Sequence, residues 1–433
     1  MMRNFIFINY KNVSVVIFFV FLFFNLHYFI NNFFSYFLNK GFNADEFYDN
    51  NLYFITDFSL NKILYTPSQP YIFISSVFNY FLNLPKIATR LVSLISCLIL
   101  SFYFINRICS VECSQLEKIY KSTLFICAIF ITNQMYIGTS DFLSYVFIIP
   151  PILMVVESIQ LRTINLKTKQ CVLIGMFFAL SVATRPTSIV LIVSFYGAFF
   201  LIGYFKVFFY KENFIILITS LIIFFMINFL PLIQQNKIIL DVKEIPKETG
   251  VTWFQRNYLM AKYWDSNKIP KTQWISTQEV IDFKKANPNF IIPKNQIDLL
   301  IKEPGLYFRQ MVRMLIKALY TSYRFMYMLF LILFFAFIKD KRWGTISTIN
   351  LHFGSKIFQN KFIVVFHLIS ILLFSFLAVK LFEFRWIIPI MILYVYFSIQ
   401  YLAIFPEKLR FLVYNISFIS GIIMFIFTLL KTN

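Results

Sequence analysis

Long apolar runs recur along the whole chain, and short stretches between them hold most of the charged residues. A helix that crosses a bilayer needs about 20 mainly apolar residues. By that criterion the runs predict about eleven transmembrane helices, at 13–35, 89–106, 122–138, 142–161, 171–184, 187–205, 214–234, 322–338, 362–382, 386–405 and 411–430. The expected fold class is an all-α polytopic membrane protein.

Two junctions in this pattern carry specific breaks. Between residues 122 and 161 the chain is predicted to form a hairpin of two spans, because the polar stretch 138–141 is costly in hydrocarbon. Arg185 and Pro186 are predicted to end one span before the next begins, since a charge and a helix breaker stand together there. The first break places Asp141 in a turn, and the second places Arg185 at a span end.

Basic residues mark alternate short loops, which indicates the orientation of the chain. Cytoplasmic loops of membrane proteins carry an excess of Lys and Arg. With the N-terminus inside, the inner loops hold Arg107, Lys118, Lys121, Arg162, Lys167, Lys169, Lys206, Lys211, Lys339, Lys341, Arg342, Lys356, Lys361, Lys408 and Arg410. The polar segments 36–88 and 235–321 then both lie on the outer side of the membrane.

These segments divide the chain into three parts. Residues 1–234 form an N-terminal transmembrane module whose first outer loop is 36–88, residues 235–321 form one long outer loop, and residues 322–433 form the C-terminal transmembrane helices. A loop as long as the second is usually functional or folded in its own right. In the first loop the aromatic stretch 71–84, with polar breaks, predicts a juxtamembrane helix on the membrane surface.

The composition excludes a soluble globular protein. Hydrophobic residues make up 59% of the 433 residues and charged residues 14%, whereas soluble proteins carry about 25% charged residues. A net charge of +20 suggests a nucleic-acid partner in a soluble protein; here the basic inner loops account for it, so no nucleic-acid binding is expected. The five cysteines and three histidines form no pattern typical of a disulfide or a metal site.

A set of short motifs follows one order along the predicted outer segments. An acidic pair stands soon after the first span, and a proline–tyrosine stretch leads to an Ala-x-Arg-Leu start of the second span. Further along the chain are a turn with an aspartate and a Thr-Arg-Pro sequence at the end of a span. After these come a short segment that precedes a late span and a Glu-x-Arg stretch. The motifs are Asp45-Glu46, Pro67-Ser68-Gln69-Pro70-Tyr71, Ala88-Thr89-Arg90-Leu91, Thr139-Ser140-Asp141-Phe142-Leu143, Ala183-Thr184-Arg185-Pro186, Ile301-Lys302-Glu303-Pro304-Gly305-Leu306-Tyr307 and Glu383-Phe384-Arg385-Trp386-Ile387-Ile388-Pro389.

This ordered set resembles the GT-C superfamily of polytopic glycosyltransferases, and within it the protein-mannosyltransferase and aminoarabinose-transferase group. The resemblance is firmest over residues 1–205 and returns at 300–390. It implies a GT-C-like fold with outer-face juxtamembrane helices. It also implies a polyprenyl-phosphate-linked sugar as donor and a lipid or glycan as acceptor.

Two differences from that group leave the acceptor open. Its protein-targeting members carry a β-trefoil domain in a central loop, and the segment 235–321 is too short for one. Its aminoarabinose transferases have a lysine before the proline pair, where this chain reads Thr66-Pro67-Ser68-Gln69-Pro70.

The motifs supply the residue types that transfer from a phosphate-linked sugar needs. A base must take the proton of the acceptor hydroxyl, and cations must stabilise the departing phosphate. Arginine suits the second task because its planar guanidinium matches phosphate oxygens. By the resemblance, Asp45 is the expected base and Glu46 a positioning residue. The expected substrate-binding residues are Tyr71, Arg90, Asp141, Arg185 and Arg385, with Asp141 near the acceptor or a metal.

Each arginine also has a plainer interpretation, as an interfacial residue that snorkels to the membrane surface or as the partner of an acid. No cofactor is indicated by the residues, and a requirement for a divalent cation is left open. Membrane lipids are expected partners of the apolar spans.

The expected function is therefore a glycosyltransferase at the periplasmic face of a bacterial inner membrane, in cell-surface glycan or glycolipid synthesis. An endoplasmic-reticulum enzyme with a dolichol-linked donor is an alternative. A polysaccharide polymerase or ligase also has many spans and a large outer loop; Asp45 would then be dispensable. A transporter or flippase is disfavoured, because charged residues map to loops or span ends and no two halves match.

Overall fold

The computed structural model describes residues 10–37, 55, 68–130, 132, 134–136, 138–160, 163–164, 166–202, 211–235, 253–266, 275–326, 329–333, 351–377, 384–403 and 405–432. Within this part of the chain the fold is almost entirely helical. The exception is one antiparallel pair of two-residue strands, β1 (Ile159–Gln160) and β2 (Thr163–Ile164). The expected all-α class is thus confirmed, apart from this short hairpin.

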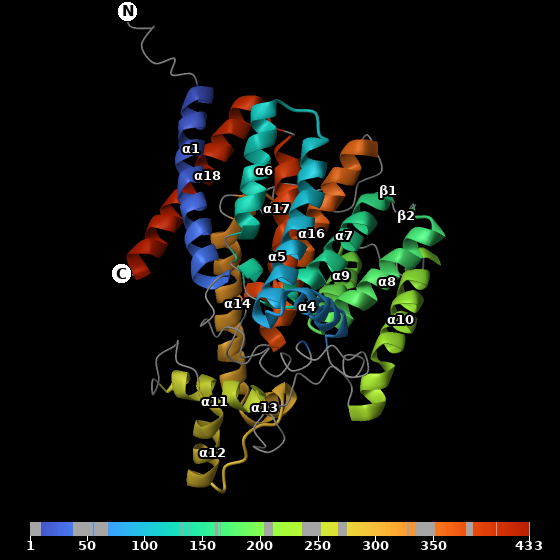
Figure 1. Ribbon diagram of the computed structural model, residues 1–433, viewed down its shortest axis with the longest axis vertical. Helices are drawn as coiled ribbons and strands as arrows, with labels where there is room; N and C mark the ends of the chain where they lie inside the picture. The colour runs from blue at the N-terminus through green and yellow to red at the C-terminus, as the bar shows by residue number, and fades with distance from the viewer. Residues whose placement is uncertain are drawn as a thin grey trace, which may run out of the picture.

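Ten helices of the described chain form a bundle along the long axis (Figure 1). They are α1 (Tyr10–Asn32), α5 (Pro85–Cys109), α6 (Gln115–Phe130), α7 (Asp141–Ser158), α8 (Thr168–Thr184), α9 (Ser188–Leu201), α10 (Lys211–Gln235), α16 (Leu351–Leu377), α17 (Ile388–Leu402) and α18 (Glu407–Thr432). Helices distant in sequence pack together: α1 lies on α18 and α9 on α16. We call the end where α1 begins the upper end and the opposite end the lower end, as in Figure 1.

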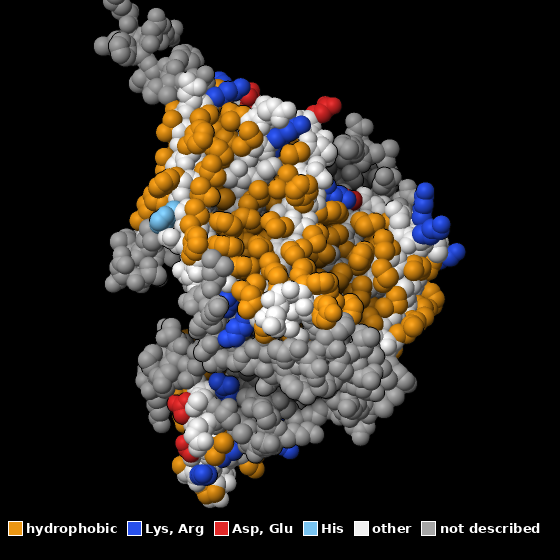
Figure 2. Space-filling model, viewed as in Figure 1, with side chains coloured by type: hydrophobic (Ala, Val, Ile, Leu, Met, Phe, Trp, Pro, Cys, Tyr) orange, Lys and Arg blue, Asp and Glu red, His pale blue; other side chains and the backbone are white. Residues whose placement is uncertain are grey.

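The bundle has the surface of a membrane protein. Five described segments are long and apolar enough to cross a bilayer: Tyr10–Ser35, Pro85–Cys109, Asp141–Ser158, Lys211–Asn228 and Gln359–Leu377. Large apolar side chains stand exposed on their outer faces, among them Phe23, Phe102 and Met226, each about 70% exposed or more (69%, 72% and 74%). Figure 2 shows apolar side chains over most of the described bundle surface on that face. Such a surface is stable against lipid and costly in water.

The predicted breaks between spans are confirmed, while some span ends differ. The hairpin between residues 122 and 161 is present, with α6 before it and α7 after it, and Arg185-Pro186 separates α8 from α9. The predicted span 122–138 is wrong at its end, because α6 stops at Phe130 and a separate 3₁₀ turn, η3 (Gln134–Tyr136), follows. The polar residues there leave the helix before its predicted end. A total of about eleven spans stays a prediction.

The helix α4 (Gln69–Leu82) forms a corner with α5 at the lower end, across the direction of the bundle (Figure 1). It corresponds to the predicted juxtamembrane helix. Asn83 ends α4 with a left-handed backbone (φ 51°), which asparagine tolerates better than most residues. Pro85 then begins α5, because its fixed φ suits the first helical position. This corner determines where the start of α5 and its Arg90 lie.

Helices α11 (Trp253–Asp265), α12 (Thr277–Ala286) and α13 (Gln296–Lys302) lie beyond the lower end of the bundle, and α14 (Pro304–Met326) leads back into it (Figure 1). They share a separate hydrophobic core that includes Leu259, Val280, Leu299 and Tyr307. Helices α11 to α13 and the start of α14 thus pack around a core of their own within the predicted outer segment. The division of the chain at residues 234 and 321 stays a prediction.

Helices α8 and α10 pack tightly against each other, and this contact leads to a stability prediction. A Cβ atom at Gly175 would lie 2.7 Å from the Ile216 carbonyl oxygen and 2.8 Å from Thr219 Cβ. Gly175→Ala should therefore lower the free energy of unfolding by about 1–3 kcal/mol, since backbone must move. In the matched control Gly197→Ala, the new Cβ atom would lie 3.7 Å from the nearest side-chain atoms of Ile369, an ordinary contact. It should be neutral or stabilising, because alanine favours a helix over glycine. Denaturant unfolding in detergent tests both, and equal losses would contradict the close contact.

Acid should loosen the contact between α11 and α14. Arg309 Nη2 donates to Asp265 Oδ2 at 2.7 Å and Arg313 Nη1 to Oδ1 at 3.0 Å. The Arg309 hydrogen bond in particular holds the pKa of Asp265 below its ordinary 3.8. A carboxylate whose pKa is lower in the folded than in the unfolded state stabilises the folded protein at pH values above its unfolded-state pKa. This contribution is lost as the pH falls through its folded-state pKa.

The measurement is the fluorescence of Trp264, whose ring stacks on the Arg313 guanidinium (4.9 Å). Its emission should change as pH falls below about 4, near the ordinary carboxyl pKa. Asp265→Asn should remove that acid transition, and Trp264→Phe identifies the signal. An unchanged transition in Asp265→Asn would show that another group is responsible.

Candidate functional site

Asp141 is the centre of the candidate site. It is the first residue of α7, and its side chain has no solvent exposure. Arg185 Nη1 lies 2.5 Å from Asp141 Oδ1, and Arg385 Nη1 lies 3.4 Å from Asp141 Oδ2. The two guanidiniums are 12% and 24% exposed. One buried carboxylate is therefore held between two cations that reach toward the protein surface.

Helix ends explain part of this arrangement. A helix N-terminus carries partial positive charge and a C-terminus partial negative charge. Asp141 is in the first turn of α7 and Arg185 directly follows the last residue of α8, so both charges suit their helix ends. Arg385 lies in the 3₁₀ turn η7 (Phe384–Trp386), just before the N-terminus of α17, where a cation is disfavoured. Its attraction to Asp141 offsets that repulsion.

Tyr145, one helical turn after Asp141, joins the same cluster. Its hydroxyl lies 3.3 Å from Asp141 Oδ1, and it also contacts the backbone carbonyl oxygen of Arg385. One proton serves one acceptor at a time, so the hydroxyl links the two residues by alternative hydrogen bonds. The sequence analysis missed Tyr145. Its signal was the i, i+4 spacing from Asp141, which puts two side chains on one helix face.

Tyr71 and Arg90 form a second group, on α4 and α5. The buried Tyr71 hydroxyl donates to the Thr89 carbonyl oxygen at 3.3 Å. Arg90 is 1% exposed, and its Nη1 donates to the Phe37 carbonyl oxygen at 2.7 Å. Phe37 ends the π-helical turn η1 (Phe33–Phe37) that follows α1. Arg90 therefore points into the protein and does not snorkel along its surface.

The turn before α7 packs against α5 and connects the two groups. Ser93 Oγ donates to the Thr139 carbonyl oxygen at 2.8 Å and lies 3.1 Å from the Thr139 backbone nitrogen. A Cβ atom at Gly138 would lie 2.4 Å from Thr89 Oγ1, so only glycine fits this approach. Tyr71, Arg90, Asp141, Arg185 and Arg385 thus belong to one continuous region at the lower end.

Two predicted residues cannot be located in this region. Asp45 and Glu46, expected as base and positioning residue, lie outside the described residues, as does Glu383 of the Glu-x-Arg stretch. The segment that carries Asp45 connects η1 to α4, and both of these elements lie at the lower end (Figure 1). The catalytic role of the acidic pair stays a prediction.

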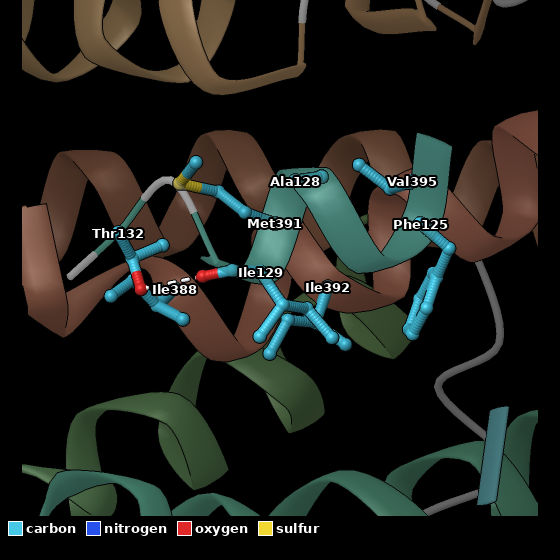
Figure 3. A pocket seen from close by; sticks show the side chains of 8 residues that line it. All are labelled: Phe125, Ala128, Ile129, Thr132, Ile388, Met391, Ile392 and Val395. Carbon is cyan, nitrogen blue, oxygen red and sulfur yellow. Dashed lines mark hydrogen bonds between the residues drawn. The ribbon is translucent and has the colours of Figure 1, made fainter. Parts of the chain in front are cut away.

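A pocket elsewhere in the described bundle is too small for a substrate. It lies between α6 and α17 and is lined by Phe125, Ala128, Ile129, Thr132, Ile388, Met391, Ile392 and Val395 (Figure 3). Its volume is about 10 Å³, at the lower limit for a single water. The Thr132 hydroxyl bonds to the Ile129 carbonyl oxygen at 2.7 Å, so the pocket presents an apolar lining.

The described residues hold no group of three His, Cys, Asp or Glu side chains placed to bind a metal ion. At Asp141 both carboxylate oxygens face arginine or tyrosine donors, which is the setting of an ion pair. The donor set suits an anion at the two guanidiniums better than a cation at the carboxylate.

No model of a protein family, no curated protein and no solved structure matches this chain. The GT-C resemblance is therefore an expectation from motifs alone.

The cluster predicts an order of stability losses. Asp141→Ala leaves two adjacent, partly buried guanidiniums without their acid and should cost about 3–5 kcal/mol. Arg185→Ala should cost less, because Arg385 still pairs with Asp141. The matched control is Lys11→Ala, whose pair with Glu407 (2.8 Å) is 43% and 44% exposed and should be worth less than about 1 kcal/mol.

Denaturant unfolding of the purified protein in detergent measures all three variants. Asp141→Asn, which keeps the shape of the side chain, replaces Asp141→Ala if that variant fails to fold. If removing Asp141 lowered the free energy of unfolding no more than Lys11→Ala does, the cluster would not hold the helices together.

Proposed function

We propose that this protein is a membrane glycosyltransferase that moves a sugar from a polyprenyl-phosphate donor to an acceptor hydroxyl. The observation that carries the proposal is the pairing of Arg185 and Arg385 around Asp141 at one end of the bundle. Two guanidiniums thus lie beside one carboxylate at this end. Paired guanidiniums at the end of a membrane bundle suit the phosphate of a lipid-linked donor.

Each residue of the cluster then has a distinct task. Arg185 and Arg385 bind the departing phosphate, because a planar guanidinium can donate to two phosphate oxygens. Asp141 orients both arginines, since its two oxygens are already engaged by them. This assignment replaces the expectation that Asp141 lies near the acceptor or a metal.

The acidic pair supplies the base. Asp45 takes the proton from the acceptor hydroxyl as that oxygen attacks the anomeric carbon, and Glu46 positions the acceptor. The bond from the anomeric carbon to the phosphate oxygen breaks, and the electron pair leaves with the phosphate. The segment of Asp45 begins and ends at the lower end of the bundle, which is the end of the arginine cluster.

The proposed setting is a bacterial inner membrane crossed about eleven times, with the lower end periplasmic. The upper end is then cytoplasmic, in line with Arg107 in the last turn of α5 and Arg410 in the first turn of α18. The acceptor is a lipid or glycan of the cell surface, because the segment 235–321 is too short for the β-trefoil domain of the protein-targeting transferases.

Transfer from radiolabelled polyprenyl-phosphate sugars tests this function. Asp45→Asn should lower the rate about 10²–10⁴-fold, the usual contribution of a general base. Arg385→Gln should lower it about 10²–10³-fold, since it removes a donor to the developing charge. Glu46→Gln should also lower it. The matched control Glu407→Gln changes an exposed acid at the upper end and should retain full activity.

Full transfer by both Asp45→Asn and Glu46→Gln would contradict the assignment of the acidic pair. Absence of transfer by the wild-type protein from every polyprenyl-phosphate sugar supplied, across hexoses and pentoses, would contradict the function itself.

A further inference from the structure

A second polar site lies at the upper end of the bundle, opposite the arginine cluster. A cavity of about 210 Å³ opens there between the end of α7, the start of the apolar part of α16 and the end of α17. Its polar lining consists of Glu157, Gln359, Asn360, Tyr396, Gln400 and Tyr401. This volume holds about seven water molecules, which is room for one sugar ring and too little for a longer glycan.

The cavity carries no net charge. Glu157 Oε2 is paired with the Arg107 guanidinium, which itself stacks on the Tyr103 ring at 4.8 Å. Tyr396 contributes its hydroxyl at 3.5 Å from Glu157 Oε1. The carboxylate of Glu157 would repel a phosphate. A cationic ligand would gain little from Glu157, because Arg107 already neutralises this acid. A neutral ligand fits this lining best.

Three side-chain amides line the cavity, those of Gln359, Asn360 and Gln400. Among the described residues, none of the three has a hydrogen-bond partner. None of their atoms is both buried and unpaired, so the amides remain accessible from the cavity. An occupant with hydroxyl groups can therefore form hydrogen bonds with them. Each amide offers donors and an acceptor, which matches hydroxyls that do both.

We infer that this cavity binds a neutral, hydroxyl-rich ring of the size of one monosaccharide. The tyrosine rings of Tyr396 and Tyr401 offer apolar faces to the C–H side of such a ring. The amides and Glu157 offer hydrogen bonds to its hydroxyl edge. The ligand is a free sugar or the sugar head of a glycolipid, which share this chemistry. The site lies at the other end of α7 from Asp141, roughly 24 Å along the helix, and does not depend on the proposed transfer reaction.

Calorimetry on the full-length protein tests the site, in lauryldimethylamine oxide, a detergent without a sugar. The probes are methyl β-D-glucoside and methyl α-D-mannoside for a free sugar. Octyl β-D-glucoside below its critical micelle concentration represents a sugar with a lipid tail. Saturable binding of at least one probe is expected. Equal affinity for methyl and octyl glucoside indicates a free sugar, and tighter binding of the octyl form indicates a glycolipid head.

The double variant Asn360→Leu/Gln400→Leu should weaken binding at least about tenfold, since it removes two hydrogen-bonding amides. The matched control Gln278→Leu removes an exposed amide on α12 and should bind as the wild type does. Gln400→Leu alone, at the less buried position, serves if the double variant does not fold. Asp141→Asn should also bind normally, which separates this site from the transfer site.

Two results would overturn the inference: no saturable binding of any of the three probes by the wild-type protein, or unchanged binding by a folded Asn360→Leu/Gln400→Leu variant.

Discussion

The arrangement of the lower end depends on the ion pairs of Asp141. A carboxylate without solvent exposure is costly unless the protein pairs it with cations. Arg185 and Arg385 come from the end of α8 and from the turn before α17, so one carboxylate draws three helices of the bundle together. The cluster therefore joins three helices and also places two guanidiniums side by side, and the proposed chemistry uses the second property.

Charge elsewhere in the bundle follows the same constraint. At the upper end the buried Glu117 accepts hydrogen bonds from Arg410 Nη2 (3.2 Å) and the Tyr414 hydroxyl (3.1 Å) and forms an ion pair with Lys121 (3.1 Å), and this joins α6 to α18. Between the helix ends the polar contacts are neutral, such as the 2.8 Å hydrogen bond that the Tyr394 hydroxyl, in the middle of α17, donates to the Phe330 carbonyl oxygen. Lipid does not solvate a charge, so ion pairs lie at the helix ends and hydroxyls suffice between them.

The two proposed sites share two helices. α7 carries Asp141 at its start and Glu157 in its last turn, and α17 follows Arg385 and carries Tyr396 and Gln400 toward its end. Their chemistry differs because their charge differs. The two guanidiniums at one end suit a phosphate, whereas the neutralised acid and the amides at the other suit an uncharged polyol. The same bundle thus presents an anionic and a neutral recognition site at opposite ends.

The sequence by itself determined the helices and most of their breaks, because apolar length and residues such as Pro186 act locally. It also singled out Asp141, Arg185 and Arg385, since charged residues at span ends are conspicuous. It misjudged the end of α6, where the pattern fades gradually. Only the tertiary structure decided the pairing of Asp141 with Arg385, 244 residues away, and the partners of Tyr145 and Glu157. Helix faces toward lipid and toward protein are both apolar, so the pattern does not show which helices are neighbours.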